Sequence, residues 1–174
     1  MSPDGPAAGS AAGSRTPLHY LPRAIRVPER PLRAIAVGWL TAFPASLLLA
    51  IVAAALLPQA RQPQFDVSGA GAMVALVLFS PVVETLIMGA ILLVLERIVP
   101  AAAAVAASAV GWGIAHSMVA PIWGMVIWWP FLVFSTLFVT WRSRSLPLAF
   151  AIPMSVHALQ NLIPALLVAF PRPA

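Results

Sequence analysis

Long apolar runs separated by short polar junctions dominate the chain from residue 32 onward. Spanning a membrane takes about 20 apolar residues at about 1.5 Å each, so the runs predict transmembrane helices. Five are expected, at Leu32–Leu57, Gly69–Leu95, Pro100–Val119, Ile122–Trp141 and Leu146–Phe170. The third and fourth share one charge-free run, Ile98 to Trp141, which we expect to fold back near Ala120 and Pro121. The pattern predicts an all-α integral membrane protein, a polytopic bundle of about five transmembrane helices.

Composition supports this class and divides the chain in two. Hydrophobic residues make up 61% and charged residues 9% of the sequence, far from the composition of a soluble domain. Residues 1–31 are rich in Pro, Gly, Ala and Ser without apolar periodicity, which predicts a disordered tail before a transmembrane domain at 32–171. The first apolar run exceeds the length of a cleavable signal segment, so we expect it to remain as an anchor. Cysteine is absent, which excludes disulfides and thiolate chemistry.

The cations indicate an orientation in the membrane. All ten are arginines, and the five predicted helices place eight on one side, against Arg61 and Arg172 on the other. The positive-inside rule then predicts a cytoplasmic N-terminus. The net charge of +5 is therefore interpreted as a topology signal and as attraction to the lipid bilayer, and nucleic acid is not an expected partner.

One carboxylate interrupts the second apolar run. Glu84 is the only charged residue between Val67 and Leu95. A carboxylate at the centre of a membrane helix costs about 2.5–3.5 kcal/mol to insert, and such residues usually mark functional sites. Glu84 is therefore a candidate site residue, within the polar island Ser80 to Thr85.

Two later helices each carry a histidine in a polar pair. His157 and Asn161 are four residues apart, which places them on one helix face. Trp112 and His116 have the same spacing, so the indole can pack against the imidazole. With Glu84, these are nearly all the strongly polar side chains in the predicted helices, and we expect His116, His157, Asn161 and Glu84 to face one internal cavity.

Such a cluster has two chemical interpretations. Glu84 can act as a general base toward a water held by His116, His157 and Asn161, and that water would attack a peptide carbonyl. Alternatively, His116, His157 and Glu84 can hold a divalent metal such as zinc, with a fourth position for water. Prolines in the predicted helices, at residues 44, 81, 130 and 153, are expected to kink them and to leave room for a polar cavity.

These residues carry a resemblance to a known family. The order of a Glu-containing helix, then aromatic-x-x-x-His at Trp112 and His116, then His-x-x-x-Asn at His157 and Asn161 resembles the CPBP intramembrane proteases. This is the CAAX-prenyl-protease and bacteriocin-processing group, formerly called the abortive-infection family. The resemblance implies an intramembrane (metallo)protease, a membrane-associated peptide or protein substrate, and a bacterial inner or plasma membrane.

The first family motif, Glu-Glu-x-x-x-Arg and often Gly, fits in two registers. Aligning Gly89 with the motif glycine places Glu84 at the second glutamate, Val83 at the first and Met88 at the arginine. Shifting by one makes Glu84 the first glutamate, the residue that the family uses to activate water, with Thr85 second. The resemblance is thus compatible with an active protease that uses Glu84.

Two other functions remain open at this stage. The apolar residues Val83 and Met88 suit a catalytically degenerate CPBP-like scaffold that binds a partner or lipid. A haem-binding electron carrier with His116 and His157 as axial ligands is a minor alternative.

Overall fold

The computed structural model describes residues 18–171, and within that range the chain forms helices and no strand. The elements are α1 (Arg23–Arg26), α2 (Pro31–Leu56), α3 (Gly69–Met73), the π-helical segment η1 (Val74–Phe79), α4 (Ser80–Leu95), α5 (Ala101–Ser117), α6 (Pro121–Arg142) and α7 (Leu146–Ala169). Among these residues, four continuous helices are long and apolar enough to cross a membrane: α2, the α3–η1–α4 unit, α6 and α7. The fifth, α5, is a shorter apolar helix. The predicted all-α membrane bundle is confirmed.

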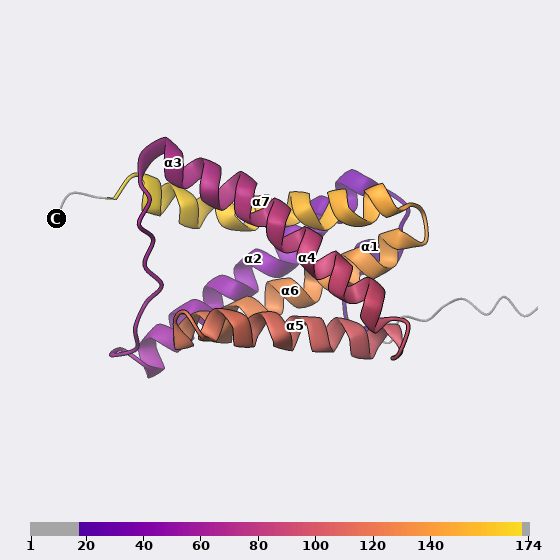
Figure 1. Cartoon of the computed structure of the whole chain (residues 1–174), viewed down its shortest axis with the longest axis horizontal. Helices are drawn as coiled ribbons and strands as arrows, with labels where there is room; N and C mark the ends of the chain where they lie inside the picture. Colours follow the sequence, from indigo (N-terminus) through magenta and orange to yellow (C-terminus); the bar gives the residue numbers. More distant parts are fainter. Residues whose placement is uncertain (1–17, 172–174) are drawn as a thin grey trace, which may run out of the picture.

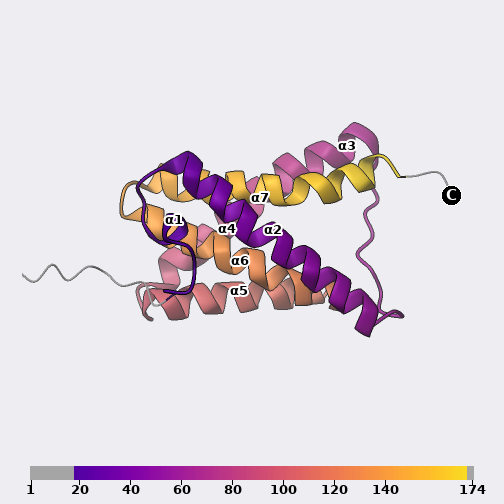
Figure 2. The same cartoon turned by 180° about the vertical axis from the view of Figure 1, so that it is seen from behind.

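Helix α6 is the centre of the bundle. Every residue from Pro130 to Phe138 is buried, as expected for a helix that is apolar all round and surrounded on every side. Helix α5 packs along α6 as an antiparallel neighbour, while α2 and α4 cross the bundle on opposite faces (Figures 1 and 2). Helix α7 contacts α2, α6 and the whole α3–η1–α4 unit. Three different helices therefore bring residues to the space beside α6.

The predicted fold-back occurs where it was expected. Helix α5 ends at Ser117, and α6 begins with Pro121 as its first residue. Proline suits this position because the first turn of a helix needs no N–H from it and its fixed φ is already helical. At the same end of the bundle, residues 57–68 connect α2 to α3 and run across the helix ends (Figure 1).

The α5–α6 hairpin is closely packed at two glycines. A Cβ atom built on Gly124 would collide with the backbone carbonyl oxygen of Gly113 and with the hydroxyl of Ser117. Small residues at helix crossings let backbones approach closely, which is a principal source of association energy in membranes. Farther along the pair, the buried Ser135 hydroxyl donates to Ser108 at 2.9 Å.

The predicted disordered tail has to be shortened. Its first part, residues 1–17, lies outside the described residues. From Leu18 onward, however, the chain packs on the bundle, and Leu18, Leu21 and Ile25 belong to the hydrophobic core. Leu18 and Leu21 precede α1, and Ile25 lies within it, so buried apolar side chains hold this stretch on the bundle and the disordered interpretation is wrong for it.

Candidate functional site

Three helices bring Glu84, His116 and His157 together. The Oε2 atom of Glu84, on α4, lies 3.8 Å from Nε2 of His116 at the end of α5. The same oxygen lies 4.0 Å from Nε2 of His157 in the middle of α7. Both imidazoles thus lie near one carboxylate oxygen. The expected proximity of these three residues is found, while the internal cavity that they were expected to share with Asn161 stays a prediction.

The carboxylate of Glu84 is held by its own helix. Ser80, one turn earlier, donates its hydroxyl hydrogen to Oε1 of Glu84 in a short hydrogen bond. Oε2 is buried and has no hydrogen-bond partner among the described residues. Within the same residues the carboxylate pairs with no arginine or lysine, so the two histidines are its only ionisable neighbours at ion-pair distance. Oε2 is therefore the atom available for chemistry.

His116 is oriented by its backbone and by aromatic rings. Its Nδ1–H donates to the carbonyl oxygen of Trp112 at 2.8 Å, because a carbonyl can only accept. The rings of Trp123 and His116 are nearly perpendicular, with 4.7 Å between their centroids. Phe131 stacks on Trp112 at 4.4 Å between ring centroids and also packs against the imidazole of His116. With Nδ1 as the donor, a neutral His116 presents the lone pair of Nε2 to Glu84.

His157 is more deeply enclosed than His116. Its ring stacks on Phe134 at 4.8 Å between centroids and meets Phe131 edge-on at 5.4 Å. Its side chain is 5% exposed, against 12% for His116. Its Nδ1 atom has no partner in the described part of the chain, so Nε2, facing Glu84, is the nitrogen placed to interact with a ligand.

The distances define what can occupy the space between these groups. A neutral His116 and an ionised Glu84 would face each other with lone pairs, and 3.8 Å is too long for a direct hydrogen bond. A water that donates one O–H group to each acceptor at about 2.8 Å would lie beside the pair, because 3.8 Å leaves no room for it on the line between them. The arrangement can therefore hold and polarise a water molecule.

Asn161 has a partner that the sequence analysis did not anticipate. Its Nδ2 donates at 2.9 Å to the carbonyl oxygen of Leu76 in η1. In η1 the N–H of Ser80 bonds to the carbonyl of Ala75, five residues back. The next donor in this π-helical register would be residue 81, but Pro81 has no N–H. Asn161 thus supplies the hydrogen bond that Pro81 removes from Leu76.

We therefore expect Asn161 and Pro81 to be coupled in stability. Asn161→Ala should destabilise the protein by about 1–2 kcal/mol, because it leaves the Leu76 carbonyl unpaired in an apolar interior. Pro81→Ala provides an N–H at position 81, so in that background Asn161→Ala should cost about 1 kcal/mol less. Reversible unfolding in detergent measures the free energy of unfolding of the wild type, the two single variants and the double variant. Strictly additive effects would contradict this account of Asn161.

A metal at this site fits the ligand types but not the spacing. Two imidazoles and a carboxylate are common zinc ligands. Zinc bonds of about 2.0–2.1 Å in a tetrahedron place ligand atoms about 3.3 Å apart, closer than the 3.8 and 4.0 Å found between Glu84 and the two histidines. Residues 18–171 contain no group of three His, Cys, Asp or Glu side chains arranged to hold a metal ion. A divalent metal held by Glu84, His116 and His157 therefore stays a prediction.

The groups packed around His116 and His157 disfavour the haem interpretation. Axial ligands must approach iron from opposite faces of a porphyrin. Phe131 packs against both His116 and His157, and Glu84 lies against their Nε2 atoms. A porphyrin could enter only by displacing these groups.

Several residues that shape the site had no assigned role in the sequence analysis. The Ser80 contact was foreseeable, because Ser80 and Glu84 are four residues apart on one helix. Trp123 was not singled out, because a tryptophan in an apolar run is ordinary packing or interface material. Phe131 and Phe134 gave no signal, since they are two apolar residues within an apolar run. Of the other first-motif positions, Met88 is completely buried and Val83 is partly buried.

A comparison of the chain with protein-family models, curated proteins and solved structures found no match in any of the three.

Proposed function

We propose that this integral membrane protein is an intramembrane endopeptidase that hydrolyses a peptide bond of a membrane-associated substrate. The observation that carries the proposal is the single carboxylate oxygen of Glu84 facing Nε2 of both His116 and His157, from three helices. A structural ion pair is a poorer account of Glu84, because no arginine or lysine in the described residues pairs with it. The ordered resemblance to CPBP proteases supports the same activity.

In the proposed reaction, Glu84 takes a proton from a water that is hydrogen-bonded to its Oε2 atom and to Nε2 of His116. The water oxygen forms a bond to the peptide carbonyl carbon, and His157, with its proton on Nε2, donates to the carbonyl oxygen on which charge develops. The carbon–nitrogen bond then breaks, and the proton held by Glu84 passes to the leaving amine. Ser80 keeps the carboxylate oriented through Oε1, leaving Oε2 for the proton transfer.

The geometry favours one register of the first family motif. Glu84 itself faces the histidines, which suits the alignment that makes it the water-activating glutamate. In that register Val83 is outside the motif, so its apolar side chain is compatible with activity. One observation supports the alternative of a non-catalytic scaffold: Asn161 donates to the backbone carbonyl of Leu76, which is a structural role.

The proposal can be tested without a known substrate. We expect His116→Ala and His157→Ala each to abolish the processing of particular membrane proteins when cells carrying these variants are compared with wild type. The N- and C-termini of all membrane proteins are quantified by mass spectrometry, at matched amounts of the protein. His19→Ala is the matched control, because His19 is exposed and outside the site. Identical termini in all four strains would favour the scaffold function.

We also propose a cytoplasmic N-terminus, in a bacterial inner or plasma membrane. The arginines at residues 23, 26, 30, 33, 97, 142 and 144 lie at the end of the bundle where α2 and α7 begin, whereas Arg61 lies at the opposite end. The positive-inside rule then assigns the first end to the cytoplasm. Reporters fused after Arg30, Gln64 and Arg144 should read inside, outside and inside, and an outside signal at Arg144 would overturn this topology.

A further inference from the structure

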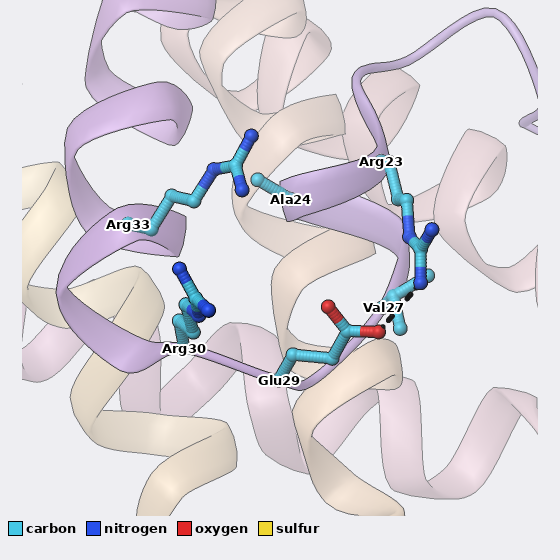
Figure 3. A pocket seen from close by; sticks show the side chains of 6 residues that line it. All are labelled: Arg23, Ala24, Val27, Glu29, Arg30 and Arg33. Atoms are coloured by element: carbon cyan, nitrogen blue, oxygen red, sulfur yellow. Dashed lines mark hydrogen bonds and ion pairs between the residues drawn. The ribbon is translucent and has the colours of Figure 1, made fainter.

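A cavity opens at the end of the bundle where α2 begins, far along the chain from the proposed protease site. Its volume is about 280 Å³, near the lower limit for small-molecule sites. The labelled side chains in Figure 3 surround it: Arg23, Ala24, Val27, Glu29, Arg30 and Arg33. Half of these six residues are arginines, so the cavity is basic.

The positive charge of this cavity is only partly neutralised. Arg23 pairs with Glu29 at 2.7 Å between its Nη2 and the carboxylate Oε1. Glu29 is the only acidic residue in the lining. Among residues 18–171, neither Arg30 nor Arg33 has a carboxylate within ion-pair distance. Two guanidinium groups on the α2 side of the cavity are therefore free to bind an anion.

The walls of the cavity are held in place by the rest of the fold. Ile25, in α1, is completely buried in the core, which anchors the segment that carries Arg23 and Val27. Arg26 donates its Nε–H to the Leu21 carbonyl at 2.7 Å. From the α6–α7 turn, Arg144 donates to the Pro28 carbonyl at 2.8 Å. An anion would meet a site whose backbone is already positioned.

The start of α2 lies at the cavity, because both Arg30 and Arg33 line it. Arg30 is the N-cap residue of α2, and no side chain caps this helix end by a hydrogen bond. The first backbone N–H groups of a helix have no partner within it, and together with the helix dipole they favour an anion such as phosphate. Because α2 is a membrane-spanning helix that starts at Pro31, this end lies at the level of lipid headgroups.

We propose that this cavity binds a phosphate-bearing anion, with Arg30 and Arg33 as its principal ligands. Arginine guanidinium groups recognise phosphate oxygens through paired N–H donors. A phosphate can come from the headgroup of an anionic phospholipid or from a free phosphate compound. The position at the membrane surface favours the lipid, because juxtamembrane basic residues attract anionic headgroups.

The test measures binding to the purified full-length protein in neutral detergent by isothermal titration calorimetry. The probes are short-chain phosphatidylglycerol, short-chain phosphatidylcholine and inorganic phosphate. We expect phosphatidylglycerol to bind most tightly, and Arg33→Gln to weaken that binding about fivefold, with a further loss of about fivefold in Arg30→Gln/Arg33→Gln. Tight binding of inorganic phosphate that Arg33→Gln weakens equally would identify free phosphate as the source.

Arg97→Gln is the matched control, since Arg97 follows α4, which ends on the side of the bundle where α2 begins (Figure 1), and does not line the cavity. It should change the affinity for phosphatidylglycerol less than twofold. An equal loss in Arg97→Gln and Arg33→Gln would overturn the proposal, because a diffuse positive field would then account for binding. Equal affinity for phosphatidylcholine, or no binding of any probe, would overturn it as well.

Discussion

Glu84→Gln should lower the rate of peptide-bond hydrolysis by about 100-fold or more while the protein remains folded. Glutamine keeps the size of the side chain and can still accept the hydrogen bond from Ser80, but an amide cannot take the proton from water. Among residues 18–171, the only carboxylate at ion-pair distance from the two histidines would be lost. The rate is measured on a substrate found by the comparison of termini, with the variant and wild type reconstituted in the same lipid.

Glu96→Gln is the control for this substitution. Glu96 follows the last residue of α4 and pairs with Arg142 at 3.0 Å, so the change removes a carboxylate outside the site. Its rate should stay within about threefold of wild type, because Glu96 pairs with Arg142 and with none of the three site residues. If Glu84→Gln keeps the wild-type rate at equal protein levels, Glu84 is not the base and the proposed mechanism is refuted.

Gly124→Val should be the most damaging single substitution for stability. Its side chain would occupy the space now filled by the Gly113 carbonyl and the Ser117 hydroxyl, and a backbone atom cannot move aside as a flexible side chain can. Overpacking of this kind costs about 3 kcal/mol, which corresponds to a loss of roughly 5–10 °C in the unfolding midpoint. Tryptophan fluorescence during heating in detergent measures the midpoint. Activity should fall too, because the strained crossing lies one residue from His116.

Gly111→Val provides the comparison within the same hairpin. A Cβ on Gly111 would meet nothing within 4 Å, so its side chain would extend into the surrounding lipid. Its midpoint should stay within about 2 °C of wild type, since valine is no worse a helix former than glycine. Equal losses in the two variants would show that the Gly113–Gly124 approach does not govern the stability of the hairpin.

The transmembrane spans were predictable because their signal is additive over many residues. The range Gly69–Leu95 was predicted to the residue, although its interior was not. Pro81 was expected to produce a kink, and the chain forms the π-helical segment η1 directly before it, which was not predicted. Which of several responses a proline causes depends on neighbouring helices, here on the side chain that Asn161 brings from α7. Such a long-range partner leaves no local pattern.

The candidate site was predictable in part for a similar reason. Glu84, His116 and His157 stand out because a polar side chain in an apolar helix requires partners. The aromatic residues around the histidines do not stand out, since Phe131 or Phe134 could face lipid or protein without any change in the apolar pattern. The buried stripe of Leu18, Leu21 and Ile25 was missed because it is short and lies among prolines and arginines.

The length of α5 has a consequence for how water reaches the site. With 17 residues, at about 1.5 Å each, it is several ångströms shorter than the roughly 30 Å of a typical hydrocarbon layer. His116 lies one residue before its end. A bilayer adapts to such hydrophobic mismatch by thinning around the short helix. The headgroup region would then dip toward His116, and a reaction that consumes water would take place at the bottom of a depression in the membrane surface.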